Sequence, residues 1–125
     1  MFTIRLLDGA FAICRLPRDS NVPPWAFSED FSSITRTPDE LSIVCLQRVV
    51  PQSVTADAAW RCLGILGPLQ LSLVGVLAQL TAVLAQEQIP VVAISTYDTD
   101  YLFVKQEHLE AGLAALLRAG NRVVR

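Results

Sequence analysis

The chain has 125 residues, of which 52% are hydrophobic, and its formal net charge at pH 7 is −2. This length is enough for one compact domain, or for two small subdomains, without disulfides or metals. Lysines and arginines are scattered rather than clustered, which argues against binding to nucleic acid or to an anionic membrane. A monomer of this size has too much surface to bury so many apolar side chains. We therefore expect a homo-oligomer, most simply a dimer.

The three cysteines, Cys14, Cys45 and Cys62, are far apart in the sequence and have apolar neighbours. An odd number without a C-x-x-C spacing predicts buried, reduced thiols rather than a disulfide framework or a zinc site. The N-terminal segment contains no uninterrupted apolar stretch typical of a signal peptide. These features predict a cytoplasmic protein.

The N-terminal half predicts short strands joined by turns. Two pairs of apolar runs have the pattern of hairpins: residues 3–7 and 11–16 around Asp8-Gly9, and residues 32–36 and 41–47 around residues 37–40. No long helical pattern occurs between them. The first half is therefore expected to be mainly β-structure.

The C-terminal half predicts two helices and four strands. The expected strands are residues 61–66, 89–96, 100–105 and 122–125, and the expected helices are residues 69–85 and 106–119. The first helix carries no charge, but at roughly 25 Å it is too short to cross a hydrocarbon core of about 30 Å. The order strand, helix, strand, strand, helix, strand predicts an α+β, ferredoxin-like fold. In that fold both helices cover one face of an antiparallel sheet.

A weak internal repeat relates the two halves. Residues 34–44 align with residues 94–104 at an offset of 60, and both segments predict a strand, a polar turn and an apolar strand. The first copy lacks the long helix that precedes the second. We expect a truncated module at residues 1–59 and a complete one at residues 60–125.

The sequence offers no recognisable catalytic or metal-binding constellation. Its single histidine, His108, stands beside Glu107 on a predicted surface helix, without a nearby serine or cysteine nucleophile. Metal-ligand spacings and glycine-rich phosphate motifs are missing as well. We therefore expect no enzymatic activity, no metal and no cofactor.

Two segments could bind a small ligand. Asp98 and Asp100 either form a turn or hold the amine of a ligand, and the sequence leaves both interpretations open. Gly67-Pro68-Leu69 joins a predicted strand to a predicted helix start, where free amides favour a carboxylate. A simple tight turn would have the same sequence.

Three stretches of the sequence carry a family resemblance: TRTPDELSIVC at residues 35–45, LGPL at residues 66–69 and ISTYDTDY at residues 94–101. Together they resemble the short stand-alone ACT-domain proteins, which are related to the ACT modules of aspartate kinases and of the animal cytosolic arginine sensor. The resemblance covers nearly the whole chain. It implies two fused ACT-like ferredoxin folds, side-by-side pairing of sheets and amino-acid sensing.

The resemblance also implies a ligand site between modules, at the loop after the first strand and on the facing strand. The corresponding positions are Gly67, Pro68, Leu69 and Gln70 in the loop, and Ile94, Ser95, Thr96 and Asp98 opposite. This loop lacks the Asp or Asn that many amino-acid-binding members carry, so Asp98 or Asp100 would have to hold the amine. The expected function is a non-enzymatic sensor that binds a small amino acid at an intermodule or dimer interface. The alternative is a ligand-free association module that dimerises.

Overall fold

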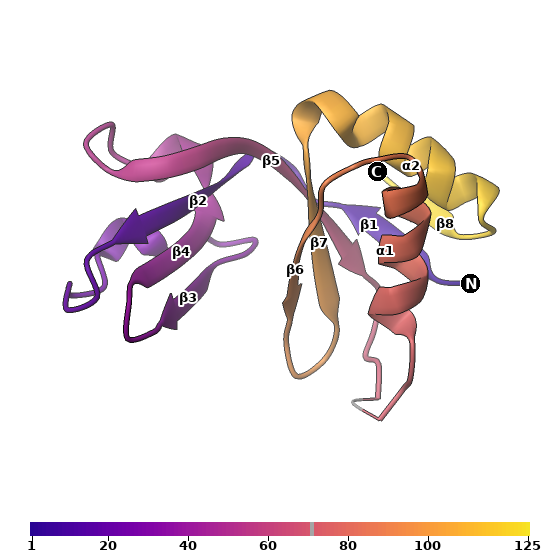
Figure 1. Cartoon of the computed structure of the whole chain (residues 1–125), viewed down its shortest axis with the longest axis horizontal. Helices are drawn as coiled ribbons and strands as arrows, with labels where there is room; N and C mark the ends of the chain where they lie inside the picture. Colours follow the sequence, from indigo (N-terminus) through magenta and orange to yellow (C-terminus); the bar gives the residue numbers. More distant parts are fainter. Residues whose placement is uncertain (71) are drawn as a thin grey trace. The chain divides into compact units, whose positions relative to one another are not determined.

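The computed structural model describes residues 1–70 and 72–125. Along these residues the chain forms strands and helices in an order that Figure 1 shows. The elements are β1 (Thr3–Leu6), β2 (Phe11–Leu16), β3 (Ser33–Arg36), β4 (Leu41–Leu46), β5 (Thr55–Ile65), α1 (Val76–Gln86), β6 (Val92–Ser95), β7 (Asp100–Lys105), α2 (Leu109–Arg118) and β8 (Arg122–Val124). Short 3-10 segments occur at Pro24–Ala26, Gln47–Val49 and Gln106–His108.

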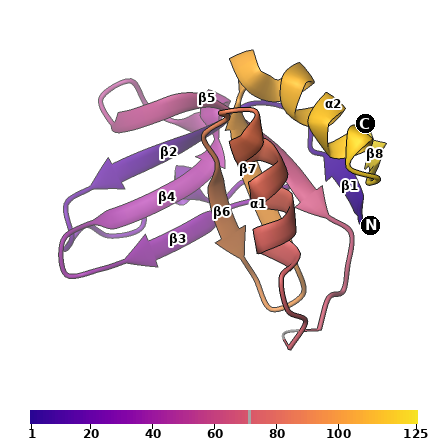
Figure 2. The same cartoon turned by 45° about the vertical axis from the view of Figure 1, so that its right-hand side comes forward.

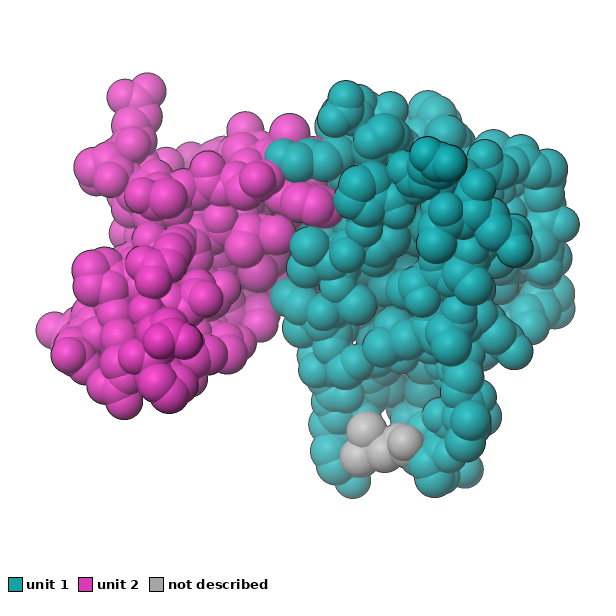
Figure 3. Space-filling view, viewed as in Figure 1, with its two compact units in different colours: residues 1–8, 61–125 teal, residues 9–60 magenta. Residues whose placement is uncertain are grey.

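The chain divides into two compact units (Figure 3). The N-terminal unit is Gly9–Trp60, and the C-terminal unit combines Met1–Asp8 with Arg61–Arg125. The division expected from the sequence, residues 1–59 and 60–125, differs from this mainly at the N-terminus. The first eight residues lie with the C-terminal unit because β1 pairs with β5 and with β8.

The sheet of the C-terminal unit has the strand order β8-β1-β5-β7-β6. Strand β1 is antiparallel to β5 and parallel to β8, and β6 and β7 form an antiparallel hairpin. From β5 onward the order β5-α1-β6-β7-α2-β8 is the predicted βαββαβ arrangement. The predicted α+β, ferredoxin-like arrangement is therefore confirmed, with β1 as an additional strand between the first and last strands of the motif.

The hairpin predicted around Asp8-Gly9 is wrong. Strands β1 and β2 do not pair with each other, because both are antiparallel to successive parts of β5. Gly9 has a φ of +83°, which breaks the strand without reversing it. A local turn signal therefore marks a break between two consecutive strands that share one long partner.

Helices α1 and α2 cover one face of this sheet (Figure 2) and form a core with it. The core consists of Ile4, Leu63, Ile65, Val76, Leu80, Leu84, Ile89, Leu102, Val104, Leu109, Leu113 and Leu116. Gly112 of α2 allows the helices to approach closely, since a Cβ there would lie 3.3 Å from Cδ2 of Leu84. Asn121 links the N-terminal segment of the chain to the end of α2. Its Oδ1 accepts a hydrogen bond from the Phe2 amide at 2.9 Å, and its Nδ2 donates one to the Leu116 carbonyl at 3.1 Å.

Helix α1 starts later than predicted, at Val76 rather than at residue 69. Gly75 precedes it with a φ of +85°, a conformation that cannot continue a helix. The predicted helix also included residue 71, which lies outside the described residues. Leu69 nevertheless packs against the core, so its apolar spacing reflects burial of a loop residue rather than a helical turn.

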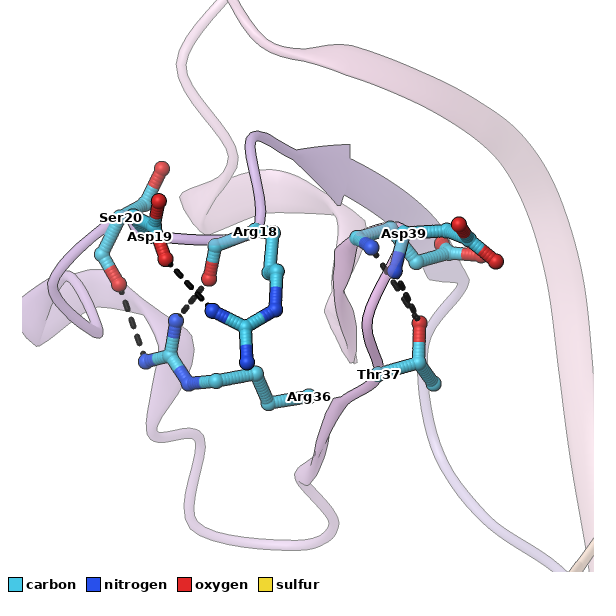
Figure 4. Close-up of polar contacts among 7 residues, drawn as sticks. Arg18, Asp19, Ser20, Arg36, Thr37 and Asp39 are labelled. Atoms are coloured by element: carbon cyan, nitrogen blue, oxygen red, sulfur yellow. Dashed lines mark hydrogen bonds and ion pairs between the residues drawn. The ribbon is translucent and has the colours of Figure 1, made fainter.

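The N-terminal unit is a sheet with the order β3-β4-β2 and then the first part of β5. One face buries Ala12, Cys14, Ala26, Leu41, Ile43 and Cys45. Figure 4 shows how arginines fasten the loop that follows β2. The guanidinium of Arg36 donates to the carbonyls of Arg18 and Ser20, and Arg18 pairs with Asp19 at 2.7 Å. Arg18 and Arg36 therefore stabilise this loop through contacts within the N-terminal unit.

The internal repeat is visible as two equivalent hairpins, β3-β4 and β6-β7. Ser33 pairs with Val44, and Val92 pairs with Phe103, so the structural spacing is 59 residues rather than the 60 of the sequence alignment. Both turns begin with a threonine whose hydroxyl accepts a backbone amide of the same turn: Thr37 from Asp39 at 3.2 Å, and Thr96 from Thr99 at 3.3 Å. At this spacing Asp39 is the counterpart of Asp98.

Candidate functional site

A cleft of about 320 Å³ opens in the C-terminal unit, between the start of α1, the segment before it and the β6-β7 turn. Its lining residues are Leu69, Gln70, Leu73, Gly75, Val76, Leu77, Ala78, Ser95, Thr96, Tyr97, Asp98, Thr99 and Asp100. A second hollow is lined by Pro68, Leu69, Gln70, Ser72, Tyr97 and Asp98. This second hollow has a volume of about 430 Å³, and it extends the same surface because it shares Leu69, Gln70, Tyr97 and Asp98 with the cleft. Below, the term cleft refers to the first of the two.

One wall of the cleft is the N-terminus of α1. The N-cap residue, Gly75, makes no capping hydrogen bond from a side chain, and the first internal hydrogen bond of the helix joins the Gln79 amide to the Gly75 carbonyl at 2.9 Å. The amides of Val76, Leu77 and Ala78 therefore precede the helical hydrogen-bond ladder. Together with the positive end of the helix dipole, they make this wall suitable for a carboxylate.

The opposite wall carries two carboxylates on the β6-β7 hairpin. Asp100 stands directly across from Ser95, whose hydroxyl donates to Oδ1 of Asp100 at 2.6 Å. Asp98 lies in the exposed turn, and its carboxylate makes no hydrogen bond or ion pair with the residues that the structure describes. One carboxylate is therefore partly engaged, while the other remains available to a cation.

Two hydrogen bonds join the β6-β7 turn to the end of β5 and to the loop that follows it. The Leu69 amide donates to the Asp98 carbonyl at 2.6 Å, and the Thr99 hydroxyl donates to the Ile65 carbonyl at 2.6 Å. Gly67 allows this close approach, because a Cβ there would lie 3.0 Å from the Asp98 carbonyl oxygen. The loop before α1 and the β6-β7 turn thus form one continuous surface.

The structure brings most of the sequence-predicted site residues together. Six of them line the cleft: Leu69, Gln70, Ser95, Thr96, Asp98 and Asp100. Pro68 lines the adjoining hollow, and Gly67 lies where the loop meets the turn. Ile94 does not line the cleft, because it lies on β6 opposite Tyr101, one position before the residue that faces Asp100.

The source of the amide donors differs from the prediction. The sequence placed them at Gly67-Pro68-Leu69, but the Leu69 amide is already bonded to Asp98 and the helix starts at Val76. The donors that line the cleft belong to the first turn of α1, which sequence reasoning missed together with Leu73, Tyr97 and Thr99. Gly75 was the available signal, since glycine is modestly favoured at the position just before the first helical turn.

The described residues contain neither a reactive thiol nor a cluster of metal ligands. Cys14, Cys45 and Cys62 are free and buried, as predicted. Burial raises the pKa of Cys62 to about 12 and that of Cys45 to about 11. Such thiols stay protonated and unreactive at neutral pH. Residues 1–70 and 72–125 contain no group of three or more His, Cys, Asp or Glu that could hold a metal ion. In the same part of the chain, every helix is too short or too polar to cross a membrane.

Comparison with known proteins identifies the family. The family model described as ACT domain matches residues 55–118, and a second model, which describes an N-terminal domain, matches residues 9–53. The crystal structure of protein Atu0741 from Agobacterium tumefaciens is similar to this chain, with 36% identity and a TM-score of 0.93. That match covers 98% of this chain and 92% of the other. The chain therefore belongs to the ACT-domain family.

More distant structures share the fold. A protein of unknown function from Vibrio cholerae, described as a possible transport protein, is 22% identical, with a TM-score of 0.76 and coverage of 94% of this chain and 88% of that one. The ligand-free regulatory subunit of aspartate kinase from Thermus thermophilus is 12% identical, with a TM-score of 0.60 and coverage of 89% and 91%. No curated protein matches the sequence. ACT domains are regulatory modules that bind small ligands, and this chain has the architecture of that class.

Proposed function

We propose that this protein is a cytoplasmic sensor that binds a small amino acid in the cleft and catalyses no reaction. The observation that carries the proposal is the placement of an uncapped helix N-terminus opposite two carboxylates, Asp98 and Asp100, across one cleft. A free amino acid presents a carboxylate and an ammonium group a few ångströms apart. The two walls of the cleft complement these two groups.

The carboxylate of the ligand would bind the first turn of α1. The amides of Val76, Leu77 and Ala78 supply donors there, and the helix dipole favours a negative charge by roughly 0.3–1 kcal/mol. The Thr96 hydroxyl also lines the cleft, although it donates to the Thr99 carbonyl at 3.1 Å. The helix start is therefore the main anion-binding element of the proposal.

The ammonium group of the ligand would bind Asp98. This carboxylate lines the cleft and has no competing partner among the described residues, whereas Asp100 already accepts the Ser95 hydroxyl. A charge-assisted hydrogen bond from an ammonium to a carboxylate contributes about 1.5–3 kcal/mol. Because Asp98 is exposed, solvent screening places its contribution at the lower end of that range.

The test is a thermal-shift screen of the twenty amino acids, followed by calorimetry on the Asp98→Asn variant. The wild type should be stabilised by at least one amino acid. The variant should bind that amino acid more weakly by about 1.5–2 kcal/mol, because the amide keeps the shape of the side chain but loses its charge. Unchanged affinity in the folded variant would place the amine elsewhere.

The internal repeat supplies a matched control. Asp39 occupies the equivalent turn position in the β3-β4 hairpin, so Asp39→Asn makes the same chemical change 59 residues earlier and in the other unit. This control should bind the amino acid with wild-type affinity. An equal loss in both variants would indicate a general electrostatic effect rather than a contact in the cleft.

A second candidate function is association without a ligand. Large apolar side chains near the cleft are exposed: Leu66 by 48%, Leu73 by 50%, Val74 by 91% and Tyr97 by 81%. A second copy of the chain could cover them, which agrees with the apolar composition, and we propose a homodimer on this basis. Light scattering at micromolar concentration should give at least twice the 13.7 kDa of one chain. A monomeric mass would contradict dimerisation, and binding of none of the twenty amino acids would favour pure association.

A further inference from the structure

Helices α1 and α2 cover one face of the sheet in the C-terminal unit, and the other face carries side chains that are exposed to solvent. This second face, with Arg5, Leu66, Arg122 and Val124, is called the open face. We infer that the open face binds the exposed acidic segment, residues 27–30, of a second copy of the chain. The inference rests on the proposed homodimer and names the surfaces that meet in it.

Strand register places two arginines near each other on the open face. Ile4 pairs with Ile65 in the core under the helices, so Arg5 points to the opposite side, because side chains alternate along a strand. In the same way Val123 packs against that core, and the preceding residue, Arg122, lies on the open face. Strands β1 and β8 are parallel neighbours, and their register puts the Cα atoms of the two arginines roughly 8 Å apart.

Both arginines are exposed and lack an anionic partner. Neither makes an ion pair or a side-chain hydrogen bond with the residues that the structure describes. The strands of this unit, as far as they are described, contain a single acidic residue, Asp100. Asp100 lies on the helix side of the sheet, since it is two residues from Leu102 of the core. The positive charge of the open face is therefore not neutralised within the unit.

Apolar side chains lie beside the arginines. Val124 pairs in register with Arg5 and is 43% exposed. Leu66 follows β5, and its amide donates to the Thr3 carbonyl at 2.9 Å, which continues the pairing one residue beyond Ile65. Alternation therefore turns the half-exposed side chain of Leu66 to the open face as well. Exposed apolar side chains together with arginine are typical of surfaces that bind another protein.

The acidic segment of the N-terminal unit has the complementary chemistry. Phe27 is 65% exposed, although it is a large aromatic residue. Glu29 and Asp30 are exposed too, and their carboxylates have no ion pair with the residues that the structure describes. One short segment thus presents an aromatic ring and two free carboxylates.

Both ends of the acidic segment are anchored in its own unit. Ala26, before it, is buried, and Phe31, after it, packs edge-to-face on Phe11 with ring centroids 6.1 Å apart. The Ser28 hydroxyl donates to the Phe31 carbonyl and closes the segment on itself. The segment is therefore ordered before it binds, which lowers the entropy that docking costs.

Charge decides which of these surfaces can meet. Two open faces placed against each other would oppose their arginines, and two acidic segments would oppose their carboxylates, so both arrangements are repulsive. The open face against the acidic segment instead pairs Arg5 and Arg122 with carboxylates and gives the ring of Phe27 an apolar surface. Each copy carries one open face and one acidic segment. A twofold axis therefore allows both contacts to form at once and closes the assembly as a dimer.

The experiment reverses the charge on either side of the contact and measures dimerisation by sedimentation velocity at micromolar concentrations. The face variant is Arg5→Glu with Arg122→Glu, and the segment variant is Glu29→Arg with Asp30→Arg. Each variant alone should dimerise at least about tenfold more weakly than the wild type, because attractive pairs become repulsive. An equimolar mixture should dimerise again, since the reversed face then meets the reversed segment and the two unchanged surfaces also meet.

Arg48→Glu is the matched control. Arg48 is an exposed arginine of the 3-10 segment Gln47–Val49, outside both surfaces, so its reversal should leave the dimer unchanged. Thermal unfolding shows whether each variant is folded. If a variant unfolds, the salt dependence of the wild type provides the test. Raising the salt concentration from about 0.05 to about 0.5 M should weaken the dimer about tenfold, and an unchanged dimer would overturn the inference.

The outcomes separate this contact from the proposed homodimer. A wild-type dimer that persists in both charge variants, or a mixture that does not dimerise again, would overturn the contact and leave the homodimer in place. If Val74→Ser alone abolished the dimer, the interface would lie at the apolar side chains beside the cleft instead. A monomeric wild type would overturn both the contact and the homodimer, whereas amino-acid binding would still be decided by its own screen.

Discussion

The Leu80→Ala substitution is expected to lower the free energy of unfolding by about 2–5 kcal/mol. Leu80 lies in the middle of α1, is only 1% exposed and belongs to the core that joins both helices to the sheet. Removing its branched end deletes apolar contacts and leaves a cavity that a sheet and two helices cannot fill without moving. Urea denaturation followed by circular dichroism measures the change.

The matched control for this prediction is Leu117→Ala in α2. Leu117 is 53% exposed and lies one residue after the buried Leu116, on the outer side of its helix. Its truncation should change stability by less than about 0.5 kcal/mol. A similar loss of stability in both variants would mean that burial of Leu80 in this core does not explain its effect.

Alkaline pH is expected to destabilise the protein through its buried thiols. Burial raises the pKa of Cys62 from its ordinary value of 9.0 to about 12. The folded thiol therefore keeps its proton at pH values where the unfolded thiol has lost it. Because the unfolded state then binds fewer protons, the free energy of unfolding falls as the pH rises from 9 toward 12.

The size of this effect follows from the shift. Each pH unit in that window costs up to about 1.4 kcal/mol, so Cys62 alone should remove roughly 2–3 kcal/mol by pH 11. Urea denaturation at pH 8 and pH 11, with wild type and Cys62→Ala compared at each, isolates this contribution. The variant should lose less stability between the two pH values, and an identical loss would show that Cys62 ionises equally in both states.

The strands could be predicted well where their signal is local. The predicted bounds of β2 and β7 match the structure, because each is an apolar run between clear turn signals. The pairing of β1 could not be read in the same way. Asp8-Gly9 predicted a reversal, but the partner of β1 is β5, which lies more than fifty residues later and whose pairing no local signal reveals.

The candidate site shows the same division between local and distant information. Ser95, Thr96, Asp98 and Asp100 are adjacent in sequence, so recognising the turn was enough to place them together. The opposite wall depended on where α1 begins. Leu69 continues the helical spacing of apolar residues upstream of Gly75, although it packs against the core from a loop. Because of this spacing, the predicted helix began at residue 69 rather than at Val76.

The most direct test of the central claim is to map the amides that respond when an amino acid binds. Two-dimensional nitrogen–proton spectra of the labelled protein should be recorded during titration with the amino acid that stabilises it most. We expect the largest shift changes at Gly75–Ala78 and at residues 95–100, the two walls of the cleft. Changes confined to residues outside the cleft, or a spectrum that stays unchanged at millimolar concentrations of every amino acid, would contradict it.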